Sequence, residues 1–532
     1  MSSSRALKTV WLFLFAICTT LPATSWSQAS KPPQIAGHPG SRKQSGAPEQ
    51  KAARYLESIR KQPLLLHAFL AQMPKGGDLH NHLSGAVYAE SFIRWAAEDG
   101  LCVDRGSLSL VAPPCDPAAG KPPATAAFAD STLYGHLLDA FSMRQFHPGP
   151  ESGHDHFFAT FGKFGAATNN HTAEMLAEVR ERAAEGHLQY MELMFNPDGG
   201  AAARLGMQLG WNDDMALMRN KLLSGGLPQI VGNASKFLDE TEKKVNDELH
   251  CGGPGALPGC SVQARYLYQV ARGLPKEAVF SQILAGFEMA SKDPRVVGLN
   301  LVMAEDWYVP IHDFRRHMDM LDFLHGLYPK VHITLHAGEL TQDLVPPEEL
   351  FHIGMSIFKG HAERIGHGVD VMQELHPWAL LQKMASLKIL AEICLTSNDV
   401  ILNVSGARHP LPIYLKSGVP VALATDDEGV SRGDITQEYQ RAAETYGLSY
   451  VQLKEFARNS LEYSFLPGRS LWWNHSARKA KECDRDMPSA ESISAGCRLF
   501  LSENEKARQQ WELEKELLRF ETLFSVTPPV LF

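Results

Sequence analysis

The feature that most constrains this chain is a set of four short clusters of metal- and proton-handling residues, each at the C-terminal end of an apolar run. In chain order they are His80-Asn81-His82, His336-Ala337-Gly338-Glu339, His367-Gly368 and Asp426-Asp427. They can act together only if the fold brings distant strand ends to one place. In a barrel of parallel strands, the loops at the carboxyl ends of all strands converge on one pocket. The clusters therefore predict a parallel barrel with a metal centre at its mouth.

Eight apolar segments of strand length recur along the chain, separated mostly by longer helical patterns. They cover residues 77–85, 188–197, 262–271, 296–305, 331–339, 364–370, 389–398 and 420–427. Strands that alternate with helices form parallel sheets, because each crossover returns the chain to the same end of the sheet. We expect an α/β protein with a (β/α)8 TIM-type barrel. A C-terminal helix over 502–524, starting with a capping box of Ser502 and Glu505, should pack on its exterior.

The amino-terminal region is expected to lie outside this barrel. A basic segment with Arg5 and Lys8 precedes a short apolar run and small residues, as in an export signal. The run is too short for a comfortable membrane span. We predict a signal peptide over 1–29, a disordered leader over 30–50 and a single barrel domain over 51–532. The protein would then be exported, periplasmic or secreted, with no membrane attachment after cleavage.

Cysteine spacing is consistent with export. Three close pairs each bracket a Pro- or Gly-containing stretch that a disulfide would restrain: Cys102 with Cys115, Cys251 with Cys260, and Cys483 with Cys497. Two pairs lie in insertions near 101–130 and 245–262, which could serve as a lid or as the contact surface of a homodimer. Cys394 lies in an apolar strand and is expected to be a free thiol. Spacing alone leaves open that all of these cysteines are reduced.

Three histidines and an aspartate have the positions required of metal ligands. His80 and His82 lie two apart on one predicted strand, so both side chains face the same side. His336 ends another strand, and an apolar strand leads straight into Asp426 and Asp427. Because adjacent strand residues face opposite ways, one carboxylate should complete the metal shell while the other faces the ligand. The fourth predicted strand carries no lysine that could bridge two metals, so one ion is expected.

Glu339 and His367 supply proton-handling groups beside that ion. Gly338 permits a tight turn that places Glu339 at the mouth of the barrel, where an acid can protonate a substrate. His367 could be either a fourth nitrogen ligand or a base beside a metal-activated water. The combination is typical of a mononuclear zinc hydrolase. A nucleophilic-serine pattern at 429–433 has no convincing Asp and His partners downstream.

As a set, these motifs resemble the adenosine deaminase family of metal-dependent barrel hydrolases. The likeness rests on residues 73–82, 336–339, 366–368, 394–398 and 425–427. The signal sequence, cysteines and insertions are closest in character to the secreted, growth-factor-related branch of the family. The resemblance implies one Zn²⁺ per chain, bound by His80, His82, His336 and Asp426.

The resemblance also implies roles for the remaining residues. Glu339 would protonate the purine ring nitrogen next to the reacting carbon, and His367 would orient and deprotonate the attacking water. Asp427 would hydrogen-bond the imidazole side of the purine. In total, the implied catalytic residues are Glu339, His367 and Asp426, and the implied substrate contacts are His82, Ser84, Glu192 and Asp427.

Two positions depart from the family pattern. Most members have an aspartate after His-x-His-Leu that contacts the ribose, and this chain has Ser84 there. Most members also place a glycine on the fourth strand so that the backbone can approach the base, and here Met303 or Ala304 occupies that stretch. Both departures concern the sugar and the fit of the base more than the reaction.

The expected function is hydrolytic deamination of adenosine or 2′-deoxyadenosine. One alternative is deamination of another 6-aminopurine, such as adenine or a modified nucleoside. A second is a secreted purine-binding protein with little turnover, although Glu339 and His367 would then have no purpose. The net charge of −9 argues against a nucleic-acid or anionic-membrane partner, both of which require a basic face. The expected partner is a small-molecule purine nucleoside.

Overall fold

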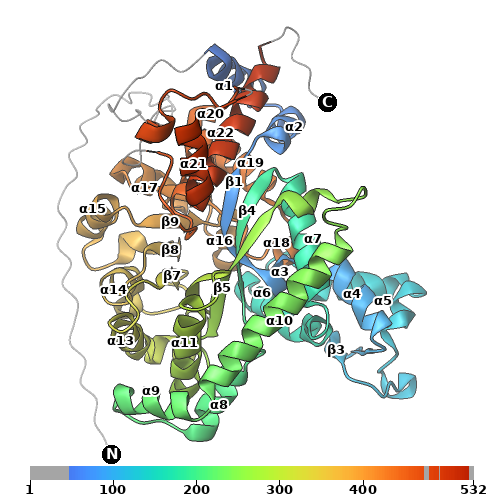
Figure 1. Ribbon diagram of the computed structural model, residues 1–532. Coiled ribbons are helices and arrows are strands. Elements are labelled where there is room, and N and C mark those ends of the chain that lie inside the picture. Colours follow the sequence, from blue (N-terminus) through green and yellow to red (C-terminus); the bar gives the residue numbers. More distant parts are fainter. Residues whose placement is uncertain (1–46, 473–477, 491, 526–532) are drawn as a thin grey trace, which may run out of the picture. The chain divides into compact units, whose positions relative to one another are not determined.

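A barrel of eight parallel strands forms the centre of the protein (Figure 1). The computed structural model describes residues 47–472, 478–490 and 492–525, and these belong to one compact unit. In order around the barrel, the strands are β1 (Gly76–His82), β4 (Leu188–Phe195), β5 (Gln263–Ala271), β6 (Val296–Val302), β7 (His332–Ala337), β8 (Arg364–His367), β9 (Leu390–Ile393) and β10 (Val421–Leu423). Each overlaps one of the eight predicted segments, which confirms the predicted TIM-type fold.

Hydrogen bonds between the first strand and the segment after the last one close the barrel. Asn81 and Asp426 form a parallel bridge. The Asp426 N–H donates to the His80 carbonyl at 2.9 Å, and the His82 N–H donates to the Asp426 carbonyl at 3.0 Å. Closure therefore places the first and last of the four sequence clusters side by side.

Helices connect the strands and surround them. Helices α1 (Ala47–Ile59) and α2 (Pro63–Gln72) precede β1. Between β1 and β5 lie α3 (Leu83–Ala86), α4 (Ala89–Glu98), α5 (Ser131–Ala140), α6 (Gly153–Phe164), α7 (Thr172–Glu185), α8 (Ala201–Leu209), α9 (Met215–Ser224) and α10 (Leu227–Glu248). Between β5 and β10 lie α11 (Lys276–Ala290), α12 (Tyr308–His312), α13 (Phe314–His325), α14 (His352–Phe358), α15 (Pro377–Leu387), α16 (Leu395–Leu402) and α17 (Leu411–Ser417). After β10 come α18 (Glu428–Ser431), α19 (Ile435–Tyr446), α20 (Tyr450–Glu462), α21 (Ala495–Glu503) and α22 (Glu505–Leu523).

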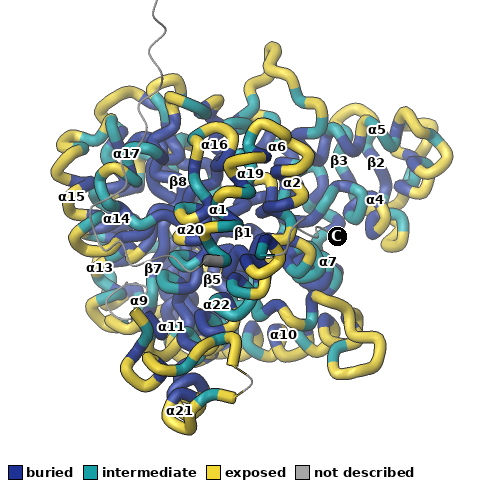
Figure 2. Tube along the Cα trace, turned by 90° about the horizontal axis from the view of Figure 1, so that it is seen from above, coloured by how far each residue is buried: buried dark blue, intermediate teal, exposed yellow. Residues whose placement is uncertain are grey.

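Burial follows this arrangement. Figure 2 shows buried backbone at the central strands and exposed backbone along the outer loops and helices. All seven residues of β6 are buried, as expected of a parallel strand covered by side chains on one face and helices on the other. The barrel is thus a filled core, and ligands can reach it only at its mouth.

Helix α1 begins inside the region that the sequence analysis expected to be a disordered leader. The helix starts at Ala47, so the predicted leader over 30–50 extends four residues too far. It is ordered because Ala52 and Leu56 are buried, and because Glu49 pairs with Lys454 at 2.8 Å. The predicted signal peptide and the rest of the leader lie outside the described residues. Among the described helices, none has both the length and the apolar character needed to cross a membrane.

The C-terminal helix packs on the barrel exterior as predicted, but its start was predicted wrongly. Ser502 lies within α21 and its hydroxyl donates to the Leu499 carbonyl, so it does not cap α22. Helix α22 starts at Glu505 and contacts α1, α20, β1 and β4. Its Glu521 accepts hydrogen bonds from Tyr450 Oη at 2.9 Å and from Lys454 Nζ at 2.5 Å. These hydrogen bonds to α20 therefore add to the apolar contacts that hold α22 on the barrel.

Disulfides restrain the excursions from the barrel. Strands β2 (Cys102–Asp104) and β3 (Ser109–Val111) form an antiparallel pair in the first insertion. The bonds join Cys102 to Cys115, Cys251 to Cys260 and Cys483 to Cys497, and Cys394 is a buried free thiol. The predicted pairing is confirmed.

Candidate metal and active site

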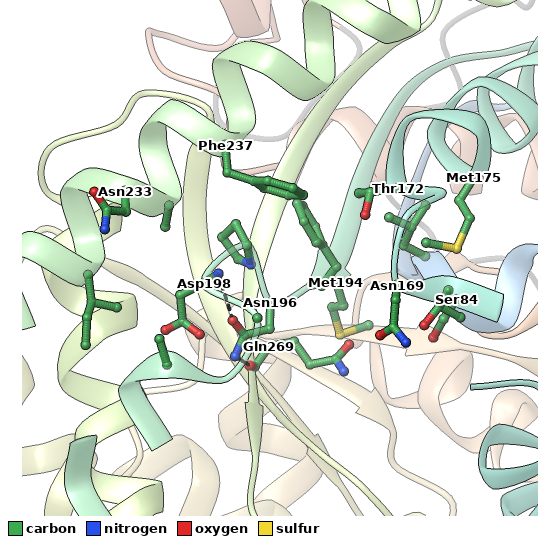
Figure 3. Close-up of a pocket in the computed structure, with 18 residues that line it drawn as sticks. Ser84, Asn169, Thr172, Met175, Met194, Asn196, Asp198, Asn233, Phe237 and Gln269 are labelled. Atoms are coloured by element: carbon green, nitrogen blue, oxygen red, sulfur yellow. Dashed lines mark hydrogen bonds between the residues drawn. The ribbon is translucent and has the colours of Figure 1, made fainter. Parts of the chain in front are cut away.

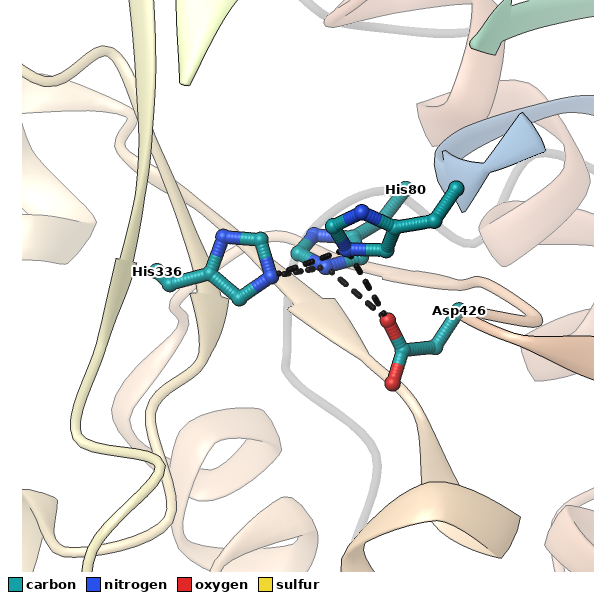
Figure 4. Close-up of side chains that lie close together, drawn as sticks. His80, His336 and Asp426 are labelled. Atoms are coloured by element: carbon teal, nitrogen blue, oxygen red, sulfur yellow. Dashed lines mark hydrogen bonds and ion pairs between the residues drawn. The ribbon is translucent and has the colours of Figure 1, made fainter. Parts of the chain in front are cut away.

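Three histidines and one aspartate converge on a single point at the mouth of the barrel (Figure 4). His336 Nε2 lies 3.0 Å from His80 Nε2 and 3.1 Å from His82 Nε2. Asp426 Oδ1 lies 3.5 Å from His80 Nε2 and 3.3 Å from His82 Nε2. Ligands at zinc-type bond lengths in a tetrahedron are about 3.3 Å apart. The observed spacing fits one such ion.

The outward nitrogen of each histidine has its own acceptor. His80 Nδ1 lies 2.7 Å from Glu392 Oε2, His82 Nδ1 lies 3.3 Å from Gln269 Oε1, and His336 Nδ1 lies 2.9 Å from Asn300 Oδ1. An oxygen acceptor requires the hydrogen to sit on Nδ1, so in each neutral ring Nε2 carries a lone pair. Three lone pairs and a carboxylate oxygen that face each other at about 3 Å repel one another unless a cation lies between them. The donor set therefore fits a metal ion.

His80 is held in place by a fully buried group of charged side chains, which consists of Glu392, Arg364 and Glu192. Glu392, which accepts from His80, also pairs with Arg364 through Nε and Oε1 at 2.6 Å. Although burial acts to raise the pKa of Glu392, the Arg364 and His80 interactions lower it below its ordinary value, so Glu392 is ionised. An ionised acceptor fixes the orientation of the His80 ring and makes it a stronger ligand.

Glu192, a predicted substrate contact, belongs to the same group of buried charged side chains. It is completely buried and pairs with Arg364 Nη2 at 2.6 Å. Its other oxygen accepts from the Phe465 N–H at 2.6 Å and from Tyr190 Oη at 2.9 Å. These partners bind both carboxylate oxygens inside the barrel, so the structure shows Glu192 as a member of a buried ion pair, and its contact with a substrate stays a prediction.

Glu339 follows β7 and lies beside the metal ligands. Its Oε1 is 3.7 Å from His367 Nε2, and its N–H donates to Glu305 Oε2 at 2.9 Å. Gly338 adopts a φ of 75°, and a Cβ there would fall 2.3 Å from Asp370 Oδ1, so only glycine fits this turn. Burial, reinforced by the charges of Asp426 and Glu305, raises the pKa of Glu339 well above its ordinary value. A raised pKa favours the protonated carboxyl, the form in which Glu339 can act as an acid.

Asp426 and Asp427 separate as expected, but not through strand alternation. Strand β10 ends at Leu423, and Asp426 has a φ of 60°, which turns the backbone between the two carboxylates. Asp427 instead lies against Gly85, where a Cβ would fall 1.5 Å from Asp427 Oδ1. Burial and the neighbouring Asp426 raise the pKa of Asp427 well above its ordinary value. This shift favours the protonated carboxyl, the form in which Asp427 could donate a hydrogen bond to a ligand.

Positive backbone angles cluster around the site. Met303, His367 and Asp426 have φ values of 87°, 67° and 60°, a region that residues other than glycine seldom occupy. The Met303 carbonyl is held by Arg272, whose Nε and Nη2 donate to it at 3.2 Å and 3.1 Å. Met303, and not Ala304, thus has the backbone conformation that favours glycine. The buried Arg272 guanidinium holds the strained backbone of Met303 in place through these two hydrogen bonds. Strained backbone is common where a site must keep one geometry.

A cavity of about 540 Å³ lies at the ends of β1, β4 and β5 (Figure 3). Its lining includes Ser84 and also Gln269, which contacts His82, but none of the candidate metal ligands and neither Glu339 nor Asp427. Its other polar side chains include Asn169, Thr172, Asn196, Asp198 and Asn233, and its apolar ones include Met194 and Phe237. No lysine, arginine or histidine is among the described residues that line it.

The family model for adenosine deaminase matches residues 153–470, more than half of the chain. The chain belongs to the adenosine deaminase family. Over 136 residues it is 40% identical to an adenosine deaminase of Escherichia coli, which covers 25% of this chain and 38% of that protein. The aligned part thus spans little more than a third of this curated relative.

Solved structures also resemble this adenosine deaminase family member. An adenine deaminase from Arthrobacter aurescens is 19% identical, with a TM-score of 0.48 over 74% of this chain and 94% of that one. An N6-methyl-AMP deaminase from Arabidopsis thaliana is 20% identical, with a TM-score of 0.47 over 75% of this chain and 94% of that one.

Several residues that hold this family's motifs in place were missed by the sequence analysis. Glu392, Asn300 and Gln269 each bind the outward nitrogen of a histidine. The available signal was a polar residue inside an otherwise apolar strand, which needs a buried partner. Residues 394–398 are one of the motifs shared with the family, but the sequence did not indicate their role. Its Ser397 hydroxyl donates to Asp426 Oδ2 at 2.5 Å, and Asn398 contacts His367.

Proposed function

We propose that this member of the adenosine deaminase family is a zinc-dependent aminohydrolase that converts adenosine or 2′-deoxyadenosine into inosine or 2′-deoxyinosine and ammonia. The observation that carries the proposal is the convergence of three Nε2 atoms and the Asp426 carboxylate on one point, with the buried Glu339 carboxyl close by. Imidazole nitrogens with one carboxylate suit Zn²⁺ better than Mg²⁺ or Ca²⁺, which prefer oxygen ligands. A protein that only binds purines would have no need of a buried acid at this place.

The side chains around the metal ligands divide the reaction between them. A zinc ion held by His80, His82, His336 and Asp426 would lower the pKa of a water molecule to about 7 and so make it a nucleophile at neutral pH. Glu339 gives its proton to the ring nitrogen beside the amine-bearing carbon, which makes that carbon more electrophilic. Asp427, neutral because of its raised pKa, donates to an imidazole nitrogen of the purine and orients the base. The water oxygen bonds to that carbon and the bond to the amino group breaks. One proton of the water leaves with the amino group as ammonia, and the other restores the Glu339 carboxyl group.

The cavity supports a nucleoside rather than a nucleotide as substrate. Phosphate groups are normally bound by arginine, lysine or helix N-termini. Helices α7 and α8 begin at the cavity wall with Thr172 and Ala201, but the described lining residues include no arginine or lysine, and the one charged side chain among them is Asp198. Its carboxylate would repel a phosphate, whereas amide, hydroxyl and carboxylate groups can all bind sugar hydroxyls. The same features argue against free adenine, which would leave these polar groups without partners.

A comparison of three substrates tests this proposal. We expect kcat/KM for adenosine to exceed that for AMP and for adenine by at least about 10²-fold, because a site built for sugar hydroxyls discriminates strongly against ligands that leave its polar groups unpaired. An ultraviolet assay on each substrate, with and without a chelator, measures both the preference and the metal requirement. Equal or faster turnover of AMP or adenine would assign the activity to the alternative substrate, and full activity after chelation would exclude the metal.

We also propose that the protein is exported with cleavage of residues 1–29. Three disulfides support this, since such bonds persist mainly in oxidising compartments. Mass spectrometry of the mature protein from its natural host should find an amino terminus near residue 30. An intact Met1 would contradict export by this route.

A further inference from the structure

A chain of hydrogen bonds runs from a backbone amide to the active-site imidazole of His367. The Leu411 N–H, in the first turn of α17, donates to His409 Nδ1 at 3.1 Å. His409 Nε2 lies 3.0 Å from Asn398 Oδ1, and Asn398 Nδ2 lies 2.9 Å from His367 Nδ1. His409 is 2% exposed, and Asn398 and His367 are fully buried. Bulk water therefore has little access to this series of hydrogen bonds, and each polar group in it must find its hydrogen-bond partner in the next one.

The direction of this chain is determined by its first member. A peptide N–H can only donate, so His409 must accept on Nδ1 and carry its hydrogen on Nε2. Burial also lowers the pKa of His409 to about 4, which agrees with a neutral ring. The Nε2 hydrogen then requires the amide oxygen of Asn398 to face His409. The amide NH₂ consequently faces His367, whose Nδ1 must accept.

His367 is thereby left with its single hydrogen on Nε2. That nitrogen has no hydrogen-bond partner among the described residues, and it faces Glu339 Oε1 at 3.7 Å. It is thus available to a reacting molecule. A nitrogen that carries a hydrogen can orient a water by donating to it but cannot take its proton.

We propose that His409 and Asn398 are positioning residues that hold His367 as a hydrogen-bond donor toward the reacting water. The proposal rests on the proposed function. It also revises the role of base that the family resemblance implied for His367. Neither positioning residue touches the substrate, because both act through the tautomer of His367.

Replacement of His409 tests the relay. His409→Leu removes the donor to Asn398, so the amide can rotate and present its oxygen to His367, which would move the hydrogen to Nδ1. In a Ser-His-Asp triad the wrong histidine tautomer costs about 10⁴-fold in kcat. Rotation of the Asn398 amide permits the wrong His367 tautomer but does not enforce it. We therefore expect kcat to fall by about 10- to 10²-fold, with unchanged metal content. His409→Gln, which keeps a side-chain donor, should restore most of the activity.

The matched control is His317→Leu on α13. His317 is fully buried, and neither ring nitrogen has a partner among the described residues, so this variant makes the same chemical change without touching the relay. It should keep the wild-type kcat. Wild-type kcat in His409→Leu, or an equal loss in His409→Gln, would overturn the relay.

Nitrogen NMR of protein labelled in its histidine rings gives a second readout, with the His367 signals assigned by their disappearance in His367→Asn. We expect His367 to carry its hydrogen on Nε2 in the wild type and partly on Nδ1 in His409→Leu. A hydrogen on Nδ1 in the wild type would refute the proposal. If the wild type deaminates no purine, the proposed function fails, and the spectrum still reports the tautomer independently.

Discussion

Replacing His336 with alanine should remove the metal ion and reduce turnover at least about 10³-fold, because the ion is expected to supply several kcal/mol of transition-state stabilisation. His336 Nε2 lies within 3.1 Å of both other imidazole ligands, so its loss opens the centre of the cluster. The purified variant should contain far less than one zinc per chain by elemental analysis. Its deamination of adenosine should be close to the background rate.

The same strand offers a matched control for this variant. His332 begins β7, is partly exposed and pairs with Glu363 at 2.8 Å, away from the metal ligands. His332→Ala should keep stoichiometric zinc and wild-type turnover. Stoichiometric zinc in His336→Ala would contradict the ligand set.

Replacing Glu339 with glutamine should keep the zinc but lower kcat by at least about 10²-fold, the usual contribution of a positioned general acid. The amide has nearly the same shape and can still donate a hydrogen bond to the ring nitrogen, but it has no acidic proton to transfer. Zinc analysis and steady-state kinetics on adenosine measure the two effects separately. Unlike His336→Ala, this variant should be a fully loaded but nearly inactive protein.

Glu348 provides the control for a Glu-to-Gln change in the same region. It lies in the connection that follows β7 and is exposed. Glu348→Gln should therefore leave both zinc content and kcat unchanged. Turnover near the wild-type level in Glu339→Gln would remove Glu339 from the mechanism.

Together, His336→Ala and Glu339→Gln distinguish metal binding from acid catalysis. Loss of zinc with loss of activity in one variant, and loss of activity alone in the other, would show that the two functions reside in different side chains. The structure predicts this separation because Glu339 is not one of the four convergent ligands His80, His82, His336 and Asp426, although its carboxyl group lies near Asp426 and His367.

Much of the barrel and of its candidate metal cluster could be predicted from the sequence, because the spacing of residues within each strand and the alternation of strands with helices are visible in it. His80 and His82 share a face of β1 through the two-residue period of a strand. His336 and Asp426 follow apolar strands, and parallel topology brings the ends of such strands to one mouth. Close cysteine spacing likewise indicated the three disulfides. In each case, the relevant distance is set by a few neighbouring residues or by the topology as a whole.

Other features depend on contacts between segments far apart in the chain. Nothing in the neighbourhood of Glu192 distinguishes a ligand contact from a buried ion pair, because its partner Arg364 is brought to it only by barrel closure. The same holds for Glu392 beside His80.

The strand order, the convergence of the four motifs and the residue types available for metal and proton chemistry can be predicted from the sequence, since they follow from periodicity and parallel topology. The tertiary structure is needed to find the direction in which the pKa of each buried carboxyl group is shifted, the nitrogen of each histidine that faces the site, and the residues that line the cavity. Those properties depend on burial and on individual hydrogen-bond partners, as between Leu411, His409 and Asn398, which the local pattern of residues does not specify.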